Sequence, residues 1–402
     1  MLASIVVAAA MASSSIVFSE PAVADALMAA AIVGLPVLGV LRLGRITLLN
    51  AALWFVVVGA GIAATSLSAT FDTAIKHQLV TLFLLLGALV ISGYIAADPE
   101  PRFHLVMVFY VAAALVATLA ALAGYFQLLP GAYDLFTSYG RGRGTFKDPN
   151  VYGAALIPAL AYLCWIMLRE KAERVVPAAF AVAVLSIGLL VSFSRGAWIA
   201  AAFAVAVVVW TAVVRFRRRS DRQRLLIVAT LGGLAFTAIV AGALQFDAVK
   251  SLFAERASLS QSYDVGPEGR FGGQQKAIAL ILDHPLGIGT HTFRDVHHPE
   301  EPHNVYLSTF LNAGWIGGLL YIASVLVTLG VGLRMSLRMG ALQGPAVVAT
   351  ASLAALAFEG VVIDSDHWRH FFIVMGCVWG LADAVPPMID SGRRRSDPQR
   401  AA

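Results

Sequence analysis

Histidines form the clearest concentration of reactive side chains in this sequence. Five of the nine histidines lie between residues 284 and 303. An imidazole group changes its protonation near neutral pH, so this cluster can supply a base or the ligands of a metal ion. No His-Glu-x-x-His sequence accompanies the cluster, and the two cysteines, Cys164 and Cys377, lie in apolar stretches. We therefore predict a histidine base in a site that uses no metal ion and no other cofactor.

Arginines form a second group of candidate site residues. They are Arg141 and Arg143 in YGRGRGTFKDPN, Arg195 in VSFSRGAW and Arg270 in PEGRFGG. A guanidinium group can hold two phosphate oxygens at once, and an arginine near hydrocarbon needs a partner or an anion. A salt bridge or a capped helix end is the alternative for each arginine alone. The set together indicates a binding site for a lipid-linked phosphate or diphosphate.

Three further motifs have simpler interpretations. GRGRG resembles a nucleotide-binding glycine loop, but no strand precedes it, so its glycines more plausibly leave room for a phosphate. In the following DPN, we expect Asp148 and Asn150 to cap a helix that Pro149 begins. Asp364-Ser365-Asp366 is a D-x-D, a pattern that holds a metal ion in some enzymes. We expect it to form salt bridges with the arginines instead.

The composition of the chain indicates a membrane protein. Of its 402 residues, 59% are hydrophobic and 13% are charged, whereas soluble domains carry about 25% charged residues. Apolar stretches of about 20 residues cross a bilayer as helices. We predict an all-α, polytopic membrane protein with about 12 transmembrane helices. The predicted spans lie near residues 2–18, 25–41, 47–66, 77–96, 104–127, 150–168, 175–192, 197–214, 225–243, 305–333, 345–363 and 370–386.

The basic residues between the predicted spans indicate the orientation of the chain. With this number of spans the main basic clusters all fall on one side, which the positive-inside rule makes the cytoplasm. They are Arg42 and Arg45; Arg169, Lys171 and Arg174; Arg215, Arg217, Arg218, Arg219, Arg222 and Arg224; Arg334 and Arg338; and Arg393, Arg394 and Arg395. Both termini are then cytoplasmic, and the net charge of +5 needs no nucleic-acid partner. A signal peptide with an Ala24-Asp25-Ala26 cleavage site is the alternative for the first span.

Two loops on the opposite side are longer than a connection needs, and loops of that length usually carry function. We predict a single membrane-embedded domain over residues 1–402, with periplasmic loops at 128–149 and 244–304. The second loop is expected to contain a helix from Phe271 to Leu282 that lies half-buried near the membrane interface. Together with the start of the following helix, this loop is predicted to carry the active site.

Four motifs resemble, in their order along the chain, those of the bacterial O-antigen ligase and polymerase superfamily. They are GTFKDPNVYG (144–153), SFSRGAW (192–198), HPLGIGTHTF (284–293) and PHNVYLSTFLNAGWIGG (302–318). The resemblance covers about residues 130–390, and the segment before it matches only in hydropathy. Twelve spans with one large, late periplasmic loop fit the same superfamily. The motifs are shared by ligases and polymerases.

The resemblance implies a metal-independent, inverting glycosyltransferase of the bacterial inner membrane. Such enzymes take a glycan from undecaprenyl diphosphate in the periplasmic leaflet and pass it to an acceptor hydroxyl. General chemistry agrees, because a neutral imidazole can deprotonate a sugar hydroxyl and guanidinium groups can neutralise a departing diphosphate. The implied site residues are the base His303 and the diphosphate- or glycan-binding residues Arg195, Arg270, Arg141, Arg143 and Asn304.

The acceptor is either a second lipid-linked glycan or lipid A-core. A ligase must bind a phosphorylated core, and a basic loop would suit that acceptor. The loop at 244–304 is instead close to neutral, which slightly favours a repeat-unit polymerase. Its charges include Lys250, Arg256, Arg270, Lys276 and Arg294 against Glu255, Asp264, Glu268, Asp283, Asp295, Glu300 and Glu301. The alternatives are an O-antigen ligase, a protein oligosaccharyltransferase and a secondary transporter. A transporter is disfavoured because carriers place ionisable groups near the bilayer midplane.

Overall fold

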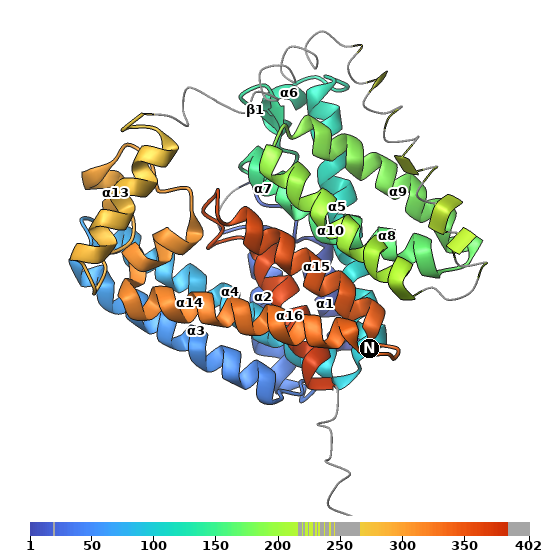
Figure 1. The fold of residues 1–402 in the computed structure, drawn as a ribbon, viewed down its shortest axis with the longest axis horizontal. Coiled ribbons are helices and arrows are strands. Elements are labelled where there is room, and N and C mark those ends of the chain that lie inside the picture. The colour runs from blue at the N-terminus through green and yellow to red at the C-terminus, as the bar shows by residue number, and fades with distance from the viewer. Residues whose placement is uncertain are drawn as a thin grey trace, which may run out of the picture.

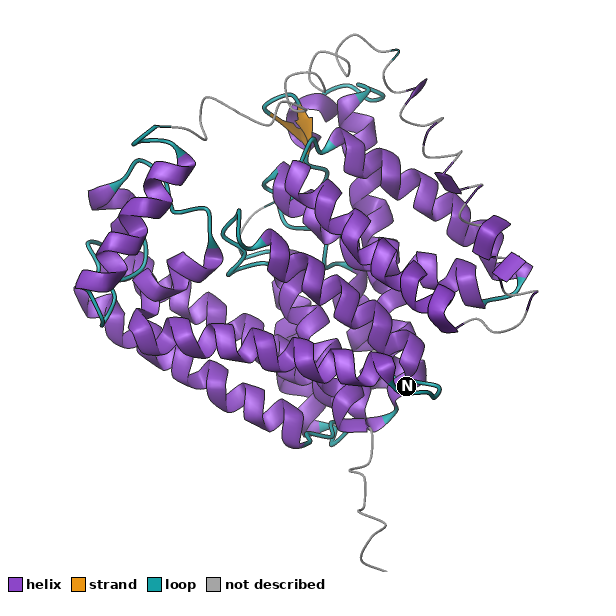
Figure 2. Ribbon diagram, in the orientation of Figure 1, coloured by secondary structure: helices purple, strands orange, loops and turns teal. Residues whose placement is uncertain are grey.

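The computed structural model describes residues 1–18, 21–215 and 266–384, with isolated positions between 219 and 245. These residues form a bundle of helices with one two-stranded hairpin (Figure 1, Figure 2). The predicted span 225–243 has only scattered described positions. Several residues used in the sequence analysis lie outside the described residues: Arg217, Arg218, Arg224, Lys250, Glu255, Arg256, Asp264, Arg393, Arg394 and Arg395.

The elements follow one another along the chain as a series of helices with few strands. The helices are α1 (Leu2–Ala12), α2 (Val23–Val37), α3 (Arg45–Ala64), α4 (Phe71–Ala97), α5 (Pro99–Tyr125), α6 (Ala132–Phe136), α7 (Pro149–Ala155), α8 (Ile157–Arg169), α9 (Ala172–Val191), α10 (Arg195–Arg215), α13 (Arg270–Asp283), α14 (Val305–Leu337), α15 (Gln343–Glu359) and α16 (Arg369–Ala384). Two single turns, η1 (Thr65–Leu67) and η2 (Phe293–His297), and the strands β1 (Thr137–Ser138) and β2 (Arg141–Gly142) complete the set.

Helices occupy the eleven predicted spans that the structure describes, the span 225–243 being largely outside the described residues, and the described residues are nearly all helical. Within the described part of the chain, seven helical segments are long and apolar enough to cross a bilayer, which fits a multi-pass membrane protein. The count of twelve spans and the orientation stay predictions. The predicted span 2–18 was too long, because the hydroxyls of Ser13 and Ser14 donate to carbonyl oxygens of the preceding turn at 3.1 and 2.7 Å. Such local bonds compete with the backbone bonds of a helix.

Glycines bring α16 against α4 in the centre of the bundle. A Cβ atom at Gly376 would lie 2.5 Å from the carbonyl oxygen of Ala88, and one at Gly380 would lie 2.5 Å from that of Ser92. Close backbone approach through small residues is how helices pack in lipid, where the hydrophobic driving force between them is weak. Likewise, α3 packs along α14, and α10 packs along α15 (Figure 1). The loop at residues 360–368 therefore starts and ends on helices that are fixed within the bundle.

The long helix α14 is interrupted at Gly314, and an earlier loop fills the break. Gly314 has φ +65° and ψ −171°, which is not helical. The carbonyl oxygen of Leu311, released by the break, accepts a hydrogen bond from the amide of Ile288 at 2.8 Å. In return, the amide of Trp315 donates to the carbonyl oxygen of Pro285 at 2.9 Å. The motifs HPLGIG and NAGWIGG thus fit together as one backbone unit.

Gly314→Ala should destabilise the protein, because a Cβ atom there would lie 2.6 Å from the carbonyl oxygen of Pro285. The backbone conformation at this position is also one that residues with side chains avoid, at a cost of about 1–3 kcal/mol. We expect a lower thermal midpoint of the detergent-solubilised protein. Gly330→Ala, in the same helix, is the matched control because its Cβ atom would meet nothing within 4 Å. Equal midpoints for both variants would contradict a structural need for the break.

The helix predicted at 271–282 is confirmed as α13. Its apolar side forms a small core of its own, in which Ala277 packs with Ile288, Phe293 and Leu311. This core joins α13 to the filled break of α14. Arg270, the first residue of α13, is therefore positioned relative to the start of α14 by apolar packing rather than by chain connectivity.

The hairpin of β1 and β2 lies within the predicted loop at 128–149. Ser138 pairs with Arg141, and the two residues between them, Tyr139 and Gly140, have φ +51° and +68°. Two consecutive positive φ angles are what a type I′ turn requires. The hairpin reverses the chain within two residues and brings Arg141 back against the bundle, where it is only 9% exposed.

Candidate active site

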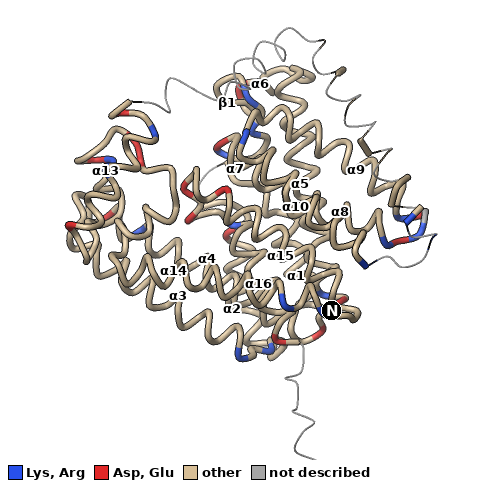
Figure 3. The backbone as a smooth tube through the Cα atoms, in the orientation of Figure 1, with Lys and Arg blue, Asp and Glu red and all other residues tan. Residues whose placement is uncertain are grey.

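Arginines from three separate parts of the chain line one cavity. The cavity has a volume of about 220 Å³ and is lined by Arg141, Arg195 and Arg270, together with Asn150, Phe193, Ser194, Gly196, Glu359, Val362 and Ile363. The arginines come from β2, from the start of α10 and from the start of α13. Elsewhere the charged residues lie mostly in loops and at helix ends (Figure 3). The structure therefore brings together three of the four arginines that the sequence indicated.

Hydrogen bonds fix the plane of the Arg141 guanidinium group. Its Nε donates to the carbonyl oxygen of Ser192 at 2.8 Å, and its Nη2 donates to Oδ1 of Asn150 at 2.6 Å. Asn150 therefore orients Arg141, and the prediction that its side chain caps α7 was wrong. The predicted cap at Asp148 is confirmed, because its Oδ1 accepts from the amides of Asn150 and Val151 at 2.7 and 3.3 Å. The predicted helix start at Pro149 is confirmed as well.

Arg195 is the first residue of α10, directly after a sharp turn from α9. Phe193 has φ +47° in that turn. Ser194 caps the new helix, since its Oγ accepts from the amide of Ala197 at 3.4 Å and its carbonyl oxygen accepts from the amide of Trp198 at 3.0 Å. The unpaired amides of a helix start carry partial positive charge. The SFSRG motif thus adds a helix N-terminus to the guanidinium group at the same cavity.

Arg143 does not line the cavity. Its Nη1 and Nη2 donate to the carbonyl oxygens of Lys147 and Leu135, at 3.4 and 3.2 Å. These bonds close the loop around the hairpin. Of the two arginines in GRGRG, Arg141 is therefore the one placed beside Arg195 and Arg270, and a role of Arg143 in substrate binding is a prediction that its position does not favour.

The cavity also contains a carboxyl group that the sequence reasoning missed. Glu359, at the end of α15, is 2% exposed, and its Oε2 has no hydrogen-bond partner among the described residues. Gly196 leaves room for it, because a Cβ atom there would lie 3.1 Å from Glu359 Oε1. The available signal was that Glu359 is the one charged residue between 343 and 363, and ionisable residues inside apolar spans are usually functional.

His303 lies in the turn before α14, between two carboxylates. Its Nε2 is 3.0 Å from Glu300 Oε2, its Nδ1 is 3.9 Å from Asp364 Oδ2, and its side chain is 33% exposed. The backbone has φ +49°, which a residue with a side chain adopts only where its surroundings impose it. Here the amide of His303 donates to Asp364 Oδ2 at 3.0 Å. An imidazole held beside a carboxylate is the arrangement of an oriented base.

Asp364 forms hydrogen bonds with the start of α14 rather than a salt bridge with an arginine. Its Oδ1 accepts from the amide of Asn304 at 3.2 Å and from Ser308 Oγ at 2.5 Å. The predicted salt bridges from the D-x-D to the arginines were therefore wrong: Asp364 binds backbone amides, and Asp366 pairs with His77 at 2.8 Å. Burial, and then the negative charge of Asp366, raises the pKa of Asp364 to about 6. Burial alone would also raise the pKa of Asp366, but the charge of His77 lowers it below the ordinary value.

The side-chain oxygen of Asn304 caps α14. It accepts from the amides of Tyr306 and Leu307 at 3.1 and 3.2 Å. The Pro-His-Asn motif therefore forms the start of α14: Asn304 caps the helix, and His303 lies directly before the cap. The binding of substrate by Asn304 stays a prediction.

The segment from Glu359 to Asp364 joins the arginine cavity to His303. Glu359, Val362 and Ile363 line the cavity, whereas Asp364 binds the His303 amide. Between them, the carbonyl oxygen of Gly360 accepts from the amide of Val305 at 2.9 Å. The arginine cavity and His303 thus both contact the segment from Glu359 to Asp364.

The five histidines between 284 and 303 do not form one cluster. His284 is exposed at the end of α13. His298 stacks on Phe293, with ring centroids 5.5 Å apart. His291 instead lies beside His77 of α4, and its Nδ1 is 3.0 Å from Glu301 Oε1. His303 is separated from these by its contacts with Glu300 and Asp364.

Comparison with known proteins finds a similarity over part of the chain. No curated protein matches it. A family model matches residues 179–322, a segment that contains Arg195, Arg270, His303 and Asn304, while Arg141 and Asp364 lie outside it. The description of that model is O-antigen ligase, so residues 179–322 are similar to the O-antigen ligase family.

Proposed function

We propose that this protein transfers a glycan from undecaprenyl diphosphate to an acceptor glycan hydroxyl at the periplasmic face of the bacterial inner membrane. The observation that carries the proposal is the convergence of Arg141, Arg195 and Arg270 on one cavity, next to the segment that holds His303. The match to the O-antigen ligase family supports glycan ligation or polymerisation in general. The donor, the mechanism and the membrane face are parts of the proposal.

The charge of the cavity suits a diphosphate. Among the described residues that line the cavity, three are arginines and one, Glu359, carries a carboxyl group. Preorganised cations stabilise a leaving diphosphate most strongly in a site where water is scarce. In this proposal the arginines neutralise the charge that builds on the leaving group, so the transfer needs no metal ion, no nucleotide and no cofactor.

The proposed reaction is a single displacement with inversion. His303 accepts the proton of the acceptor hydroxyl while the hydroxyl oxygen attacks the anomeric carbon. The bond between that carbon and the diphosphate oxygen breaks, and the diphosphate departs with the electron pair. Asp364, 3.9 Å from Nδ1, stabilises the imidazolium ion that forms. Glu300 is 68% exposed, so an acceptor hydroxyl can displace it from Nε2.

The acceptor is proposed to be a second lipid-linked glycan, as in a repeat-unit polymerase. The near-neutral charge of the loop at 244–304 supports this, although part of that loop lies outside the described residues. Deletion of the gene, with the envelope glycans separated on a gel, tests it. A polymerase deletion should leave single repeats on lipid or core. Long chains still attached to undecaprenyl diphosphate would instead identify a ligase, and unchanged glycans with altered uptake or export would favour a transporter.

Asp364→Ala should slow the transfer by about 10- to 100-fold, since it removes a charged acceptor of hydrogen bonds that hold His303, Asn304 and Ser308. The effect should fall on kcat more than on KM, because Asp364 orients the base. Asp364→Asn should recover part of the rate, since an amide oxygen still accepts a hydrogen bond. Asp283→Ala, at the exposed end of α13, is the control. A wild-type rate in Asp364→Ala would contradict the positioning role.

A further inference from the structure

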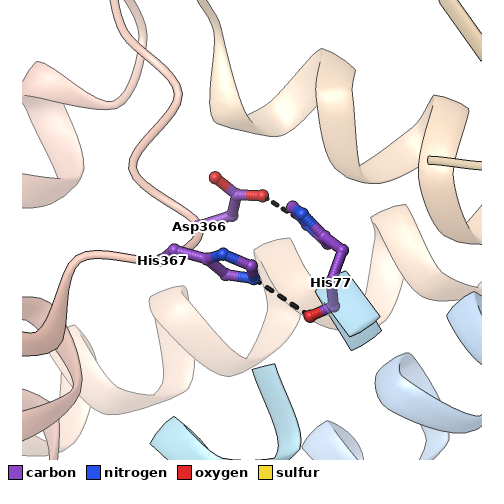
Figure 4. Close-up of side chains that lie close together, drawn as sticks. All are labelled: His77, Asp366 and His367. Carbon is purple, nitrogen blue, oxygen red and sulfur yellow. Dashed lines mark hydrogen bonds and ion pairs between the residues drawn. The ribbon is translucent and has the colours of Figure 1, made fainter. Parts of the chain in front are cut away.

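Two histidines and an aspartate converge beside the segment that holds His303 (Figure 4). His77 Nε2 lies 2.8 Å from Asp366 Oδ2, and the rings of His77 and His367 stack with centroids 3.9 Å apart. One ligand atom from each of the three residues lies within 4.8 Å of the other two. His77 belongs to α4, whereas Asp366 and His367 belong to the loop at 360–368. The side chains of His77 and Asp366 are 13% and 25% exposed, so an ion from solvent can reach them.

One ring nitrogen of His367 faces polar atoms of α4. Its Nε2 lies 3.1 Å from the carbonyl oxygen of His77 and 3.0 Å from Thr81 Oγ1. A carbonyl oxygen can only accept a hydrogen bond, so Nε2 carries a hydrogen, and Nδ1 is the nitrogen that could bind a metal ion in its deprotonated form. Histidines that bind metals characteristically donate their second N–H to a carbonyl or carboxylate oxygen. The contact of His367 Nε2 with the carbonyl oxygen of His77 has this form.

The donor set matches a transition-metal ion better than a hard cation. Two imidazole nitrogens and one carboxylate oxygen form the zinc sites that keep a position open for water, while Mg²⁺ and Ca²⁺ prefer oxygen ligands alone. In a tetrahedral site with Zn–N and Zn–O bonds of about 2.0–2.2 Å, two donors of one ion lie about 3.3–3.6 Å apart. The three ligand atoms lie within 4.8 Å of one another, so a bound ion would draw them closer together.

We propose that His77, Asp366 and His367 form a binding site for Zn²⁺ or a similar divalent transition-metal ion. The bound ion ties α4 to the loop that carries Asp364, and so braces the residue that orients His303. In this proposal the metal ion takes no part in the glycan-transfer step. Without the ion, the His77–Asp366 ion pair still joins the two elements, so glycan transfer should persist in the presence of a chelator.

Titration of the full chain with Zn²⁺ tests this site without any glycan substrate. The protein is purified in detergent through a tag that lacks histidine, stripped with EDTA, and titrated by isothermal calorimetry. We expect one saturable site per chain. His77→Ala and Asp366→Asn should each weaken binding by more than about 100-fold, and Thr81→Val, which removes an outer-shell partner, by about 10-fold. His284→Ala is the matched control and should bind as the wild type does.

Absence of saturable Zn²⁺ binding to the wild-type chain would overturn the proposal, whatever the variants do. Unchanged binding in His77→Ala and in a second ligand variant, His367→Gln, would overturn it as well, as would loss of binding in His284→Ala. Elution of each variant as a single species shows that its fold is intact. Because the readout is metal binding, a failure here is distinct from a failure of the proposed glycan transfer.

Discussion

Replacement of His303 by alanine is expected to abolish glycan transfer. A positioned general base contributes about 10²- to 10⁴-fold to a rate, and we expect a loss in that range. The side chain is 33% exposed in a turn, so its removal takes little packing from the core. The protein should therefore still reach the membrane at normal levels. The measurement is transfer from a purified undecaprenyl-diphosphate-linked glycan, supported by complementation of a deletion strain.

Two further variants separate the loss of the base from a change in the turn. His303→Asn should be as inactive as alanine, although asparagine tolerates the left-handed backbone that His303 adopts. His284→Ala, an exposed histidine of the same stretch, should transfer normally. Product at wild-type levels from either His303 variant would exclude this histidine as the base.

Arg195→Lys is expected to lose most of the activity although it keeps the positive charge. A lysine ammonium group is a point charge and cannot replace the two-pronged contact of a guanidinium group with a diphosphate. Loss of one preorganised donor to a developing anion lowers kcat by about 10²- to 10³-fold. The measurement is kcat/KM for the lipid-linked donor. The same direction is expected for Arg270→Lys, because Arg270 lines the same cavity.

Arg143→Lys provides the matched control, since it is the same substitution two residues from the cavity-lining Arg141. The Arg143 guanidinium group binds carbonyl oxygens of its own loop, so the variant should retain near wild-type activity. Full activity of Arg195→Lys would mean that Arg195 only balances charge. Equal losses at Arg143 and Arg195 would contradict the assignment of the diphosphate to the cavity.

The elements could be predicted from the sequence where the determining contacts are local. Apolar runs of sufficient length located the long helices, and the helix at 271–282 followed from its apolar run and the Asp-His-Pro that ends it. Asp148 and Pro149 begin α7 as their types indicate. The end of α1 was missed because serine hydroxyls, which hydropathy does not weigh strongly, turn the chain six residues early.

The partners within the site could not be predicted, because they lie far apart in the chain. Asp364 meets the amide of His303 across 61 positions, and Arg141 meets the carbonyl oxygen of Ser192 across 51. The D-x-D pattern carries no information on whether an amide, a histidine or an arginine faces each carboxylate. The choice between Arg141 and Arg143 depended on the hairpin turn at Tyr139 and Gly140, which decides which guanidinium group returns to the bundle.

The break at Gly314 also sets the depth at which the proposed reaction takes place. α14 has 33 residues, and at 1.5 Å per residue it would be about 50 Å long, against a hydrocarbon core of about 30 Å. The part after the break, residues 315–337, is about 35 Å long and is sufficient to cross that core. We therefore expect the first turns of α14, with His303 before them, to stand among the lipid headgroups. A polyprenyl diphosphate carries its phosphates at that level while its tail stays in the hydrocarbon, so the donor can react without leaving the bilayer and the acceptor without entering it.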